Sequence, residues 1–265
     1  MATSNDKVLF EKKELRGSRL RCLMLTSMPR NQVARCLMEL VQPYGFVDAS
    51  RDHRMPCGFL NPDEAKLGES PDFLSEKQRK ALTAWWLKVT RNANTPNWDI
   101  VSTCKIEGQP GLILVEAKAY DKELKQNDKC NASNPDNLEQ IGNAIRKANT
   151  GLNAILSGWG LSQDSHYQIC NRFAWSWKIA TLGVPVILVY LGFLKAEEMA
   201  DQGKPFNSID EWGDIIRSHA HGIVPDGVWN MRLEINGTPM RTLIHALDIC
   251  WVTSGGEENR SAIWV

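Results

Sequence analysis

The 265-residue chain lacks the features that mark membrane, secreted or repeat proteins. Its longest apolar stretch, residues 184–194, is too short to cross a bilayer. The start of the chain mixes acidic, basic and amide side chains and has no apolar region of the kind found in signal peptides. No internal repeat of solenoid or propeller period is present. These absences predict a soluble globular protein of the cytoplasm, with no membrane segment.

The seven cysteines form no recognisable metal-binding or disulfide pattern. They are scattered along the chain, odd in number and without a CxxC pair. We therefore expect reduced, buried thiols, with Cys104 and Cys250 in apolar surroundings. Walker A, Rossmann glycine and G-x-S-x-G patterns are missing too. Their absence argues against nucleotide-driven chemistry and against an α/β-hydrolase.

An excess of positive charge is also missing, which counts against a strong general affinity for nucleic acid without excluding it. The charge is nevertheless uneven, because basic residues crowd the first forty positions and recur on a later segment. A solvated helix face is the usual reason for such runs, and a phosphate-facing surface is the alternative. The basic residues are Lys12, Lys13, Arg16, Arg19, Arg21, Arg30 and Arg35, followed by Lys77, Arg79, Lys80, Lys88 and Arg91.

Apolar side chains recur at three- and four-residue steps in several segments, which indicates amphipathic helices. A capping box, Ser75 to Gln78, opens one of them. We predict helices over 31–41, 75–91, from Asn134 onwards, over 167–182 and over 208–219. Trp175 and Trp177 in the fourth of these are expected to pack in the core rather than to stack on bases.

Strand patterns lie between these helices. We predict strands over 98–106 and 111–118 joined by a turn, a strand buried on both faces over 184–193, and a hairpin at Asn236-Gly237. This order of elements predicts a mixed α/β or α+β domain. The segment from 47 to 75 shows no period, so it is either a functional loop or a carrier of short elements.

Two charged residues end the apolar strand over 111–118. Glu116 and Lys118 are two apart in a strand and therefore share a face. A lone carboxylate at the end of a buried strand is costly unless it is paired, hydrated or bound to a metal. If the preceding strand pairs across the turn, Asp99 lies opposite residues 116–119. The hairpin would then bring two carboxylates and an ammonium to one end of the sheet.

These three groups suit phosphodiester hydrolysis. Two carboxylates can hold Mg²⁺, which prefers hard oxygen ligands and can make a water a better nucleophile. Lys118 would orient that water, assist its deprotonation or stabilise the transition state. The alternative is an ordinary surface pair of Glu116 and Lys118, worth little energetically. The apolar residues leading into the pair weaken that alternative.

Asp99, sixteen intervening residues and then Glu116-Ala117-Lys118 resemble the PD-(D/E)XK signature of restriction-endonuclease-like nucleases. That family's core is a helix, a three-stranded meander, a helix and another strand, an order similar to that of residues 75–193. The resemblance implies metal binding by Asp99 and Glu116, with Mg²⁺ or Mn²⁺, and catalysis by Lys118. The chain departs from the pattern at Pro96, which is not adjacent to the aspartate, and the third strand of the meander has no clear candidate.

Some members of that family add an acidic residue from the first core helix and a glutamine from the helix after the lysine. Glu76 or Glu39 would be the former and Gln140 the latter. The resemblance also divides the chain, with all three parts forming one compact domain. The parts are an N-terminal extension (1–74), a nuclease-like core (75–195) and a C-terminal helix and hairpin packing on that core (196–265).

The sequence therefore predicts a metal-dependent endonuclease acting on nucleic acid, with DNA as the expected substrate. The basic N-terminal stretch and the segment 47–75 are candidates for substrate contact, and a homodimer would suit double-strand cleavage. A non-catalytic nucleic-acid-binding or scaffold protein on the same fold is the alternative, and an interaction protein without a nucleic-acid role is a third. His219 and His221 lie two apart at a helix end, where a helix-terminal role is favoured over metal binding.

Overall fold

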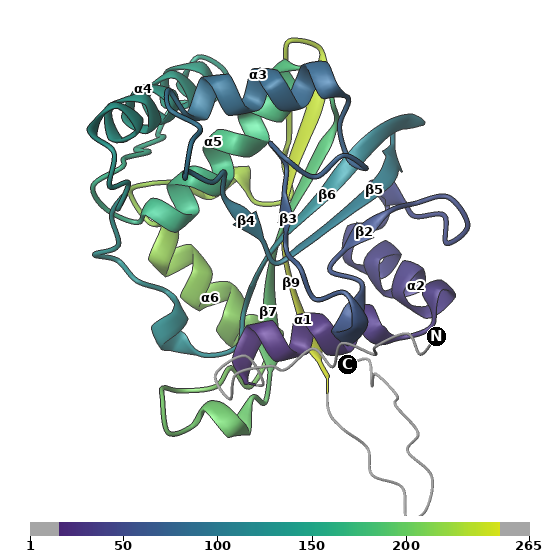
Figure 1. Ribbon diagram of the computed structural model, residues 1–265. Helices are drawn as coiled ribbons and strands as arrows, with labels where there is room; N and C mark the ends of the chain where they lie inside the picture. The colour runs from purple at the N-terminus through teal and green to yellow at the C-terminus, as the bar shows by residue number, and fades with distance from the viewer. Residues whose placement is uncertain (1–15, 250–265) are drawn as a thin grey trace, which may run out of the picture.

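The computed structural model describes residues 16–249, which form one central mixed sheet flanked by helices (Figure 1). The strand order is β1-β5-β6-β7-β9-β8, and β2 also pairs with β5. The helices are α1 (Gly17–Ser27), α2 (Arg30–Val41), α3 (Glu76–Trp86), α4 (Pro135–Asn153), α5 (Tyr167–Thr181) and α6 (Ile209–Ala220). The strands are β1 (Gly45–Phe46), β2 (Arg54–Met55), β3 (Ala65–Lys66), β4 (Asn97–Trp98), β5 (Ile100–Ile106), β6 (Gln109–Lys118), β7 (Val186–Leu194), β8 (Arg232–Ile235) and β9 (Thr238–Asp248).

The sheet is antiparallel at its two sides and parallel in its middle. β5 and β6 are antiparallel, β7 runs parallel to both β6 and β9, and β8 closes the far side antiparallel to β9. α1 and α2 cover one face, and α3 to α6 cover the other (Figure 1). The prediction of a mixed α/β fold is confirmed.

Strand β7 is buried along its whole length, as its continuous apolar sequence predicted. Ile187 and Val189 pack in the cluster beneath α1 and α2. Leu188 and Tyr190 pack in the cluster beneath α3 to α6. Because both faces of β7 are apolar, a strand of this kind can lie only inside a sheet that is covered on both sides.

Two tight turns close the hairpins. Asn236 and Gly237 have φ values of 51° and 81°, and Glu107 and Gly108 have 51° and 80°. Positive φ at both central residues is the type I′ geometry that matches the twist of the flanking strands. The Asn236-Gly237 hairpin is thus confirmed. The first turn is shorter than predicted, since β6 already begins at Gln109.

The capping box at Ser75 and Gln78 is present, but α3 ends at Trp86 rather than at residue 91. The side chain of Asn137 on α4 explains the early end. It accepts hydrogen bonds from the backbone N–H groups of Lys88 and Val89 at 2.9 and 2.8 Å. A tertiary contact from α4 therefore takes up donors that a longer helix would have used itself.

The third strand beside the β5–β6 hairpin comes from the chain before α3. β1 and β2 both pair with β5, with Gly45 opposite Ile106 and Arg54 opposite Ser102. The segment 47–75 therefore carries short elements, β2 and β3 among them. Both apolar clusters draw residues from each side of the predicted boundaries at 74/75 and 195/196.

Other expectations concern single residues. Trp175 is fully buried in the core, as predicted, and Trp177 is partly buried and packs against it. All six cysteines within 16–249 are free; five are buried and Cys57 is exposed, while Cys250 lies outside the described residues. Among residues 16–249, no helix is long and apolar enough to cross a membrane.

Candidate functional site

The side chains of β6 alternate between the two faces of the sheet until two charges end the strand. Leu112 and Leu114 face α3 to α6, whereas Ile113 and Val115 face α1 and α2. Glu116 and Lys118 continue the even-numbered face, as expected of residues two apart. Glu116 is 1% exposed and Lys118 is 6% exposed. The pair is therefore buried, and the alternative of an ordinary surface pair is wrong.

Asp99 lies across from Glu116, as the assumed register predicted. Ile100 is opposite Val115, so the next step along the two strands brings Asp99 to Glu116. The Oδ2 atom of Asp99 accepts a hydrogen bond from the backbone N–H of Ala117 at 2.7 Å. The predicted strand from residue 98 is interrupted here, because β4 pairs with β3 and the chain bends at Asp99 before β5 begins.

Helix α5 adds a fourth charged group, Arg172, which is 6% exposed. Its Nε donates to Oε2 of Glu116 at 2.5 Å, while Nζ of Lys118 donates to Oε1 of the same carboxylate. The guanidinium carbon of Arg172 also lies 4.4 Å from the ring centroid of Trp98. Both oxygens of Glu116 therefore have a cationic partner.

Burial and neighbouring charge shift the pKa values of Asp99 and Glu116 in opposite directions. Burial opposes the charged form of Glu116, but Arg172 and Lys118 outweigh it and hold the pKa of Glu116 below its ordinary value. Burial and the charge of Glu116 raise the pKa of Asp99 to about 7, against the attraction of Lys118. A cation bound between Asp99 and Glu116 would favour the ionised form of both carboxyl groups.

The same carboxylates shift the pKa values of Lys118 and Arg172. Burial lowers the pKa of Lys118, yet Glu116 and Asp99 outweigh that effect and raise it overall. The pKa of Arg172 is likewise raised by Glu116 and Asp99 against the cost of burial. Both groups therefore stay protonated while Glu116 is ionised. In that state they act as positive charges and not as bases.

Acidic residues beyond this cluster are engaged elsewhere. Glu123 accepts from the backbone N–H of Ala119 at 2.5 Å and from the hydroxyl of Ser18 at 2.9 Å. Glu64 pairs with Arg19 at 2.7 Å. Within residues 16–249, no group of three or more His, Cys, Asp or Glu side chains could hold a metal ion. The donors available for a metal are thus the two carboxylates of Asp99 and Glu116.

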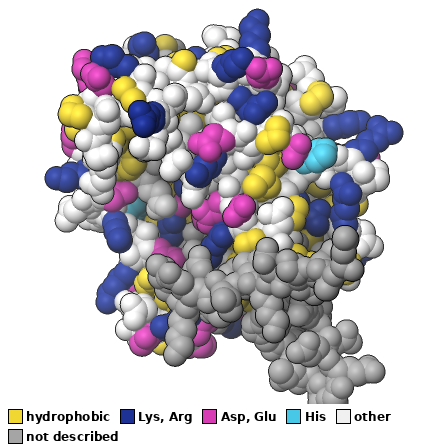
Figure 2. All heavy atoms as spheres, viewed as in Figure 1, with side chains coloured by type: hydrophobic (Ala, Val, Ile, Leu, Met, Phe, Trp, Pro, Cys, Tyr) yellow, Lys and Arg dark blue, Asp and Glu magenta, His cyan; other side chains and the backbone are white. Residues whose placement is uncertain are grey.

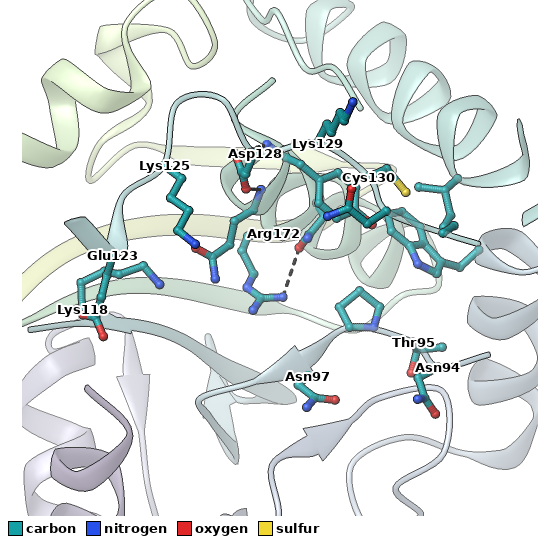
Figure 3. A pocket seen from close by; sticks show the side chains of 18 of the residues that line it. Asn94, Thr95, Asn97, Lys118, Glu123, Lys125, Asp128, Lys129, Cys130 and Arg172 are labelled. Atoms are coloured by element: carbon teal, nitrogen blue, oxygen red, sulfur yellow. Dashed lines mark hydrogen bonds between the residues drawn. The ribbon is translucent and has the colours of Figure 1, made fainter. Parts of the chain in front are cut away.

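A pocket of about 720 Å³ opens beside the cluster, and Lys118 and Arg172 are part of its wall (Figure 3). One side is the segment 94–97 that leads into β4, and the other is the loop after β6. That loop supplies Lys122, Lys125 and Lys129, which are exposed and have no ion pair among the described residues. The pocket therefore carries an excess of positive charge.

Asp128 makes no ion pair with these lysines among the described residues. Its carboxylate accepts from the backbone N–H groups of Tyr167 and Gln168 at 2.9 and 2.8 Å. It thereby satisfies the first free donors of α5, whose own preceding residue, His166, makes no side-chain cap. The contact also fixes the loop against the helix that carries Arg172.

The predicted accessory residues are not brought to this cluster. Glu76 is exposed on the first turn of α3 and pairs with Lys80. Gln140 donates to the backbone carbonyls of Ala84 and Trp85 at the end of α3, at 3.2 and 3.0 Å. Glu39 is exposed on α2, on the opposite face of the sheet. Gln140 thus helps to end α3 and is not among the residues that line the pocket.

The basic residues near the start of the chain also have other partners. Arg16 pairs with Asp201, Arg19 with Glu64 and Arg21 with Glu198. These three arginines hold α1 to the rest of the fold, whereas Arg30 and Arg35 are exposed on α2, on the opposite face of the sheet from the pocket. Lys12 and Lys13 lie outside the described residues. Figure 2, drawn from the same side as Figure 1, shows acidic side chains near the middle of the face in view.

Sequence reasoning missed the lysines of the loop after β6 and gave Arg172 no defined role. The loop has the composition of an ordinary polar connection, and only the fold brings its lysines to the same pocket as Lys118. Arg172 is 56 positions from Glu116, and no spacing rule joins a helix residue to a strand residue at that separation. The sequence signal was three polar residues on one helix, Gln168, Asn171 and Arg172, which could face the site, although exposed helix surface was the default expectation; Asn171 and Arg172 are in fact buried.

No family model matches the chain, and no curated protein or solved structure is significantly similar to it. A functional assignment therefore rests on the side chains of this site and on their geometry.

Proposed function

We propose that the protein is a divalent-metal-dependent nuclease that hydrolyses phosphodiester bonds, with DNA as the expected substrate. One observation carries the proposal. The carboxylate of Glu116 is buried at the end of a central strand, between Lys118 and Arg172, with Asp99 opposite and a cationic pocket alongside. A structural ion pair would not need two extra charged groups and an open pocket beside them.

The arrangement of elements supports the resemblance to restriction-endonuclease-like nucleases. The acidic residue precedes one strand of a hairpin, the E-x-K sequence ends the other, and helices lead from there to a parallel strand, β7. One departure is that the third strand of the meander precedes α3 in the chain. The pattern of strands around β6 is nonetheless the one in which such a site would sit.

The donor chemistry fits a hard divalent cation. Asp99 and Glu116 would hold Mg²⁺ or Mn²⁺, since carboxylate oxygens are the ligands that these ions prefer. The Oδ1 atom of Asp99 accepts no hydrogen bond from the described residues, and the raised pKa of its carboxyl group marks a place where negative charge is under-compensated. When bound, the cation would supply charge stabilisation at the phosphate and a more acidic water.

The chain's own residues would bind and polarise the phosphate. Lys118 and Arg172 now share the charge of Glu116, and an incoming phosphate offers both a second anionic partner. Because they are buried, their interaction with charge that develops on the phosphate oxygens is poorly screened by water. Lys118, as an ammonium group, would orient the attacking water or donate a proton to the leaving oxygen.

A non-catalytic nucleic-acid-binding protein on the same fold is the second candidate. It is favoured by one observation: both oxygens of Glu116 are already engaged by cations, and within residues 16–249 no third ligand completes a metal site. In that case the lysines beside the pocket would bind phosphate without any cleavage. Binding would then survive the Lys118→Ala substitution, and there would be no activity to lose.

The test is nuclease activity of the purified full chain on DNA and on RNA, with Mg²⁺, Mn²⁺ or EDTA. Lys118→Ala and the isosteric Glu116→Gln should each lower the cleavage rate by about 100-fold or more. Lys77→Ala, at an exposed lysine of α3, is the matched control and should cut normally. Metal-dependent cutting that persists in both site variants would mean a different centre, and no cutting by the wild type would favour the binding protein.

A further inference from the structure

The charged cluster lies deep beside the pocket rather than on an open face. Glu116, Lys118 and Arg172 are at most 6% exposed, and Lys118 and Arg172 form part of the pocket wall. The opening lies between the segment 94–97 and the loop 120–132. An intact duplex is a stiff, wide cylinder that is too large to be enclosed in a pocket of this volume. A single flexible strand can bend into it.

The pocket volume points the same way. About 720 Å³ lies within the range of roughly 300–1,000 Å³ that pockets for small ligands occupy. This space suits one or two nucleotides and not a stretch of double helix. Figure 3 shows Lys118 and Glu123 at one end of the pocket and Asn94 and Thr95 at the other, so the two ends offer different chemistry.

Amide side chains are a second polar component of the pocket lining. Asn97, Asn131 and Gln168 line the pocket, and their side chains make no hydrogen bond within the described residues. An amide offers donors and an acceptor in one plane, which is the pattern on the edge of an unpaired base. The ring of Tyr167 lies on the same lining, is only partly buried and gives a base a surface to stack on.

The lysines of the loop after β6 complete the arrangement. Lys125 and Lys129 are exposed beside the pocket and have no acidic partner among the described residues, since Asp128 is engaged with the first turn of α5. Such lysines can follow a phosphate backbone that leads towards Arg172. The pocket thus combines cationic side chains with free amides and an aromatic ring, which suit the phosphate and the base of a nucleotide.

We propose that this pocket receives an unpaired nucleotide, with its phosphate at Lys118 and Arg172 and its base among the amide side chains. The substrate class is therefore single-stranded nucleic acid, or an unpaired end or loop, and not continuous duplex. This inference rests on the proposed function, because it names the substrate of the same site. DNA and RNA share the chemistry on which it depends, and separate arms of the experiment distinguish them.

The experiment measures binding in EDTA, where no metal-dependent cleavage occurs. The probes are short fluorescent oligonucleotides: single-stranded DNA, single-stranded RNA, a blunt DNA duplex, and a single strand with abasic positions. We expect at least one intact single strand to bind about tenfold or more tightly than the duplex. The abasic strand should bind about fivefold or more weakly than its intact counterpart, because it has no base to contact the amide side chains of the pocket.

Variants locate the binding. The Lys125→Ala/Lys129→Ala double variant should weaken single-strand binding about tenfold and lower the slope of log K against log salt by about 0.7 per lysine. Gln168→Ala should lower affinity for the intact strand several-fold and leave the abasic strand unchanged. Lys77→Ala on α3 and Gln32→Ala on α2 are matched controls, because both side chains are exposed and lie outside the pocket.

Equal or tighter binding of the duplex would overturn the proposal, as would equal binding of the abasic strand or no binding of any probe. Its failure is distinct from failure of the proposed function. Single-strand binding that depends on Lys125 and Lys129 but is never followed by cleavage would refute the nuclease and leave the pocket assignment standing. Metal-dependent cutting of duplex without a preference for single strands would do the reverse.

Discussion

Arg172 on the second turn of α5 donates from Nε to Oε2 of Glu116, the carboxylate near the end of β6, at 2.5 Å. The two side chains are 7% and 2% exposed, so neither charge is compensated by water. Removing one partner of such a pair leaves the other buried without compensation, at a cost of roughly 3–5 kcal/mol. Lys118 still pairs with Glu116 when Arg172 is absent, which places the cost at the lower end.

Arg172→Met should therefore lower the free energy of unfolding by about 3 kcal/mol. Arg172→Lys should cost less, because it keeps the charge and loses mainly the planar contact with Trp98. Denaturant unfolding measures both, with Arg35→Met on the exposed side of α2 as the control. A loss no larger than that of the control would show that the pair contributes nothing to stability.

Asp99→Asn should stabilise the protein, in contrast to substitutions at Arg172. Burial and Glu116 raise the pKa of Asp99 from 3.8 to about 7. As the pH rises between these values, the unfolded chain releases this proton while the folded protein keeps it, so the wild type loses stability. Asparagine stays neutral and still offers an oxygen to the N–H of Ala117. The variant should gain about 1–3 kcal/mol above pH 7.

The pH dependence makes this prediction specific. The stability difference between Asp99→Asn and wild type should grow from about pH 4 to about pH 7 and then remain constant. Asp164→Asn, at an exposed carboxylate, should show no such growth. A variant that is less stable than wild type at pH 8 would contradict the assigned direction of the pKa shift. The proposed nuclease activity should fall in the same variant, as expected where a functional site is built at the expense of stability.

Sequence patterns predicted the parts of the fold that local physics controls. The capping box at Ser75, the type I′ turn at Asn236-Gly237 and the doubly buried β7 all follow from a few neighbouring residues. The pairing of Asp99 with the end of β6 followed from one assumed register, because a short turn leaves a hairpin little choice. These predictions are confirmed for that reason.

The missed features depend on residues far apart in sequence. The early end of α3 depends on Asn137, and the closure of the cluster depends on Arg172. Pairing of β1 and β2 with β5 joins segments about sixty and about fifty positions apart, respectively, and β1 and β2 are each too short to show a period. Gln140 matched a family pattern but turned towards α3 instead, since spacing along a chain does not fix which neighbour a polar side chain meets.

His219 in the last turn of α6 gives a further pH-dependent prediction. It is 8% exposed, its ring centroid lies 4.9 Å from that of His166, and burial, His166 and Lys118 lower its pKa from 6.5 to about 4. Between these values a falling pH protonates the unfolded chain but not the folded protein. The wild type should therefore lose about 2 kcal/mol more than His219→Gln as the pH falls through this interval.

Thermal or denaturant unfolding across this pH range measures the effect. His221→Gln is the matched control, since that side chain is exposed two residues further along. Parallel pH profiles for wild type and His219→Gln would mean that His219 is not held neutral by its surroundings. The helix-terminal placement predicted for these histidines holds, but His219 faces inwards rather than towards solvent.

Asn137 allows the link between α3 and α4 to be tested on its own. Its side chain is 3% exposed, accepts from the N–H groups of Lys88 and Val89, and donates to the carbonyl of Val89 at 2.8 Å. Asn137→Ala would remove all three bonds and should lower the free energy of unfolding by about 2–3 kcal/mol. Asn143→Ala on the same helix, where the amide meets only the surface side chain of Arg146, should cost far less.

Hydrogen exchange would show where the loss occurs. In Asn137→Ala the amides of Lys88 and Val89 should exchange faster, because their acceptor is gone, while amides within β6 should exchange at rates set only by the global change in stability. The segment after α3 leads to residues 94–97, which form one side of the pocket. Loosening this segment should therefore weaken single-strand binding as well. Unchanged exchange at Lys88 and Val89 would contradict the role assigned to Asn137 in ending α3.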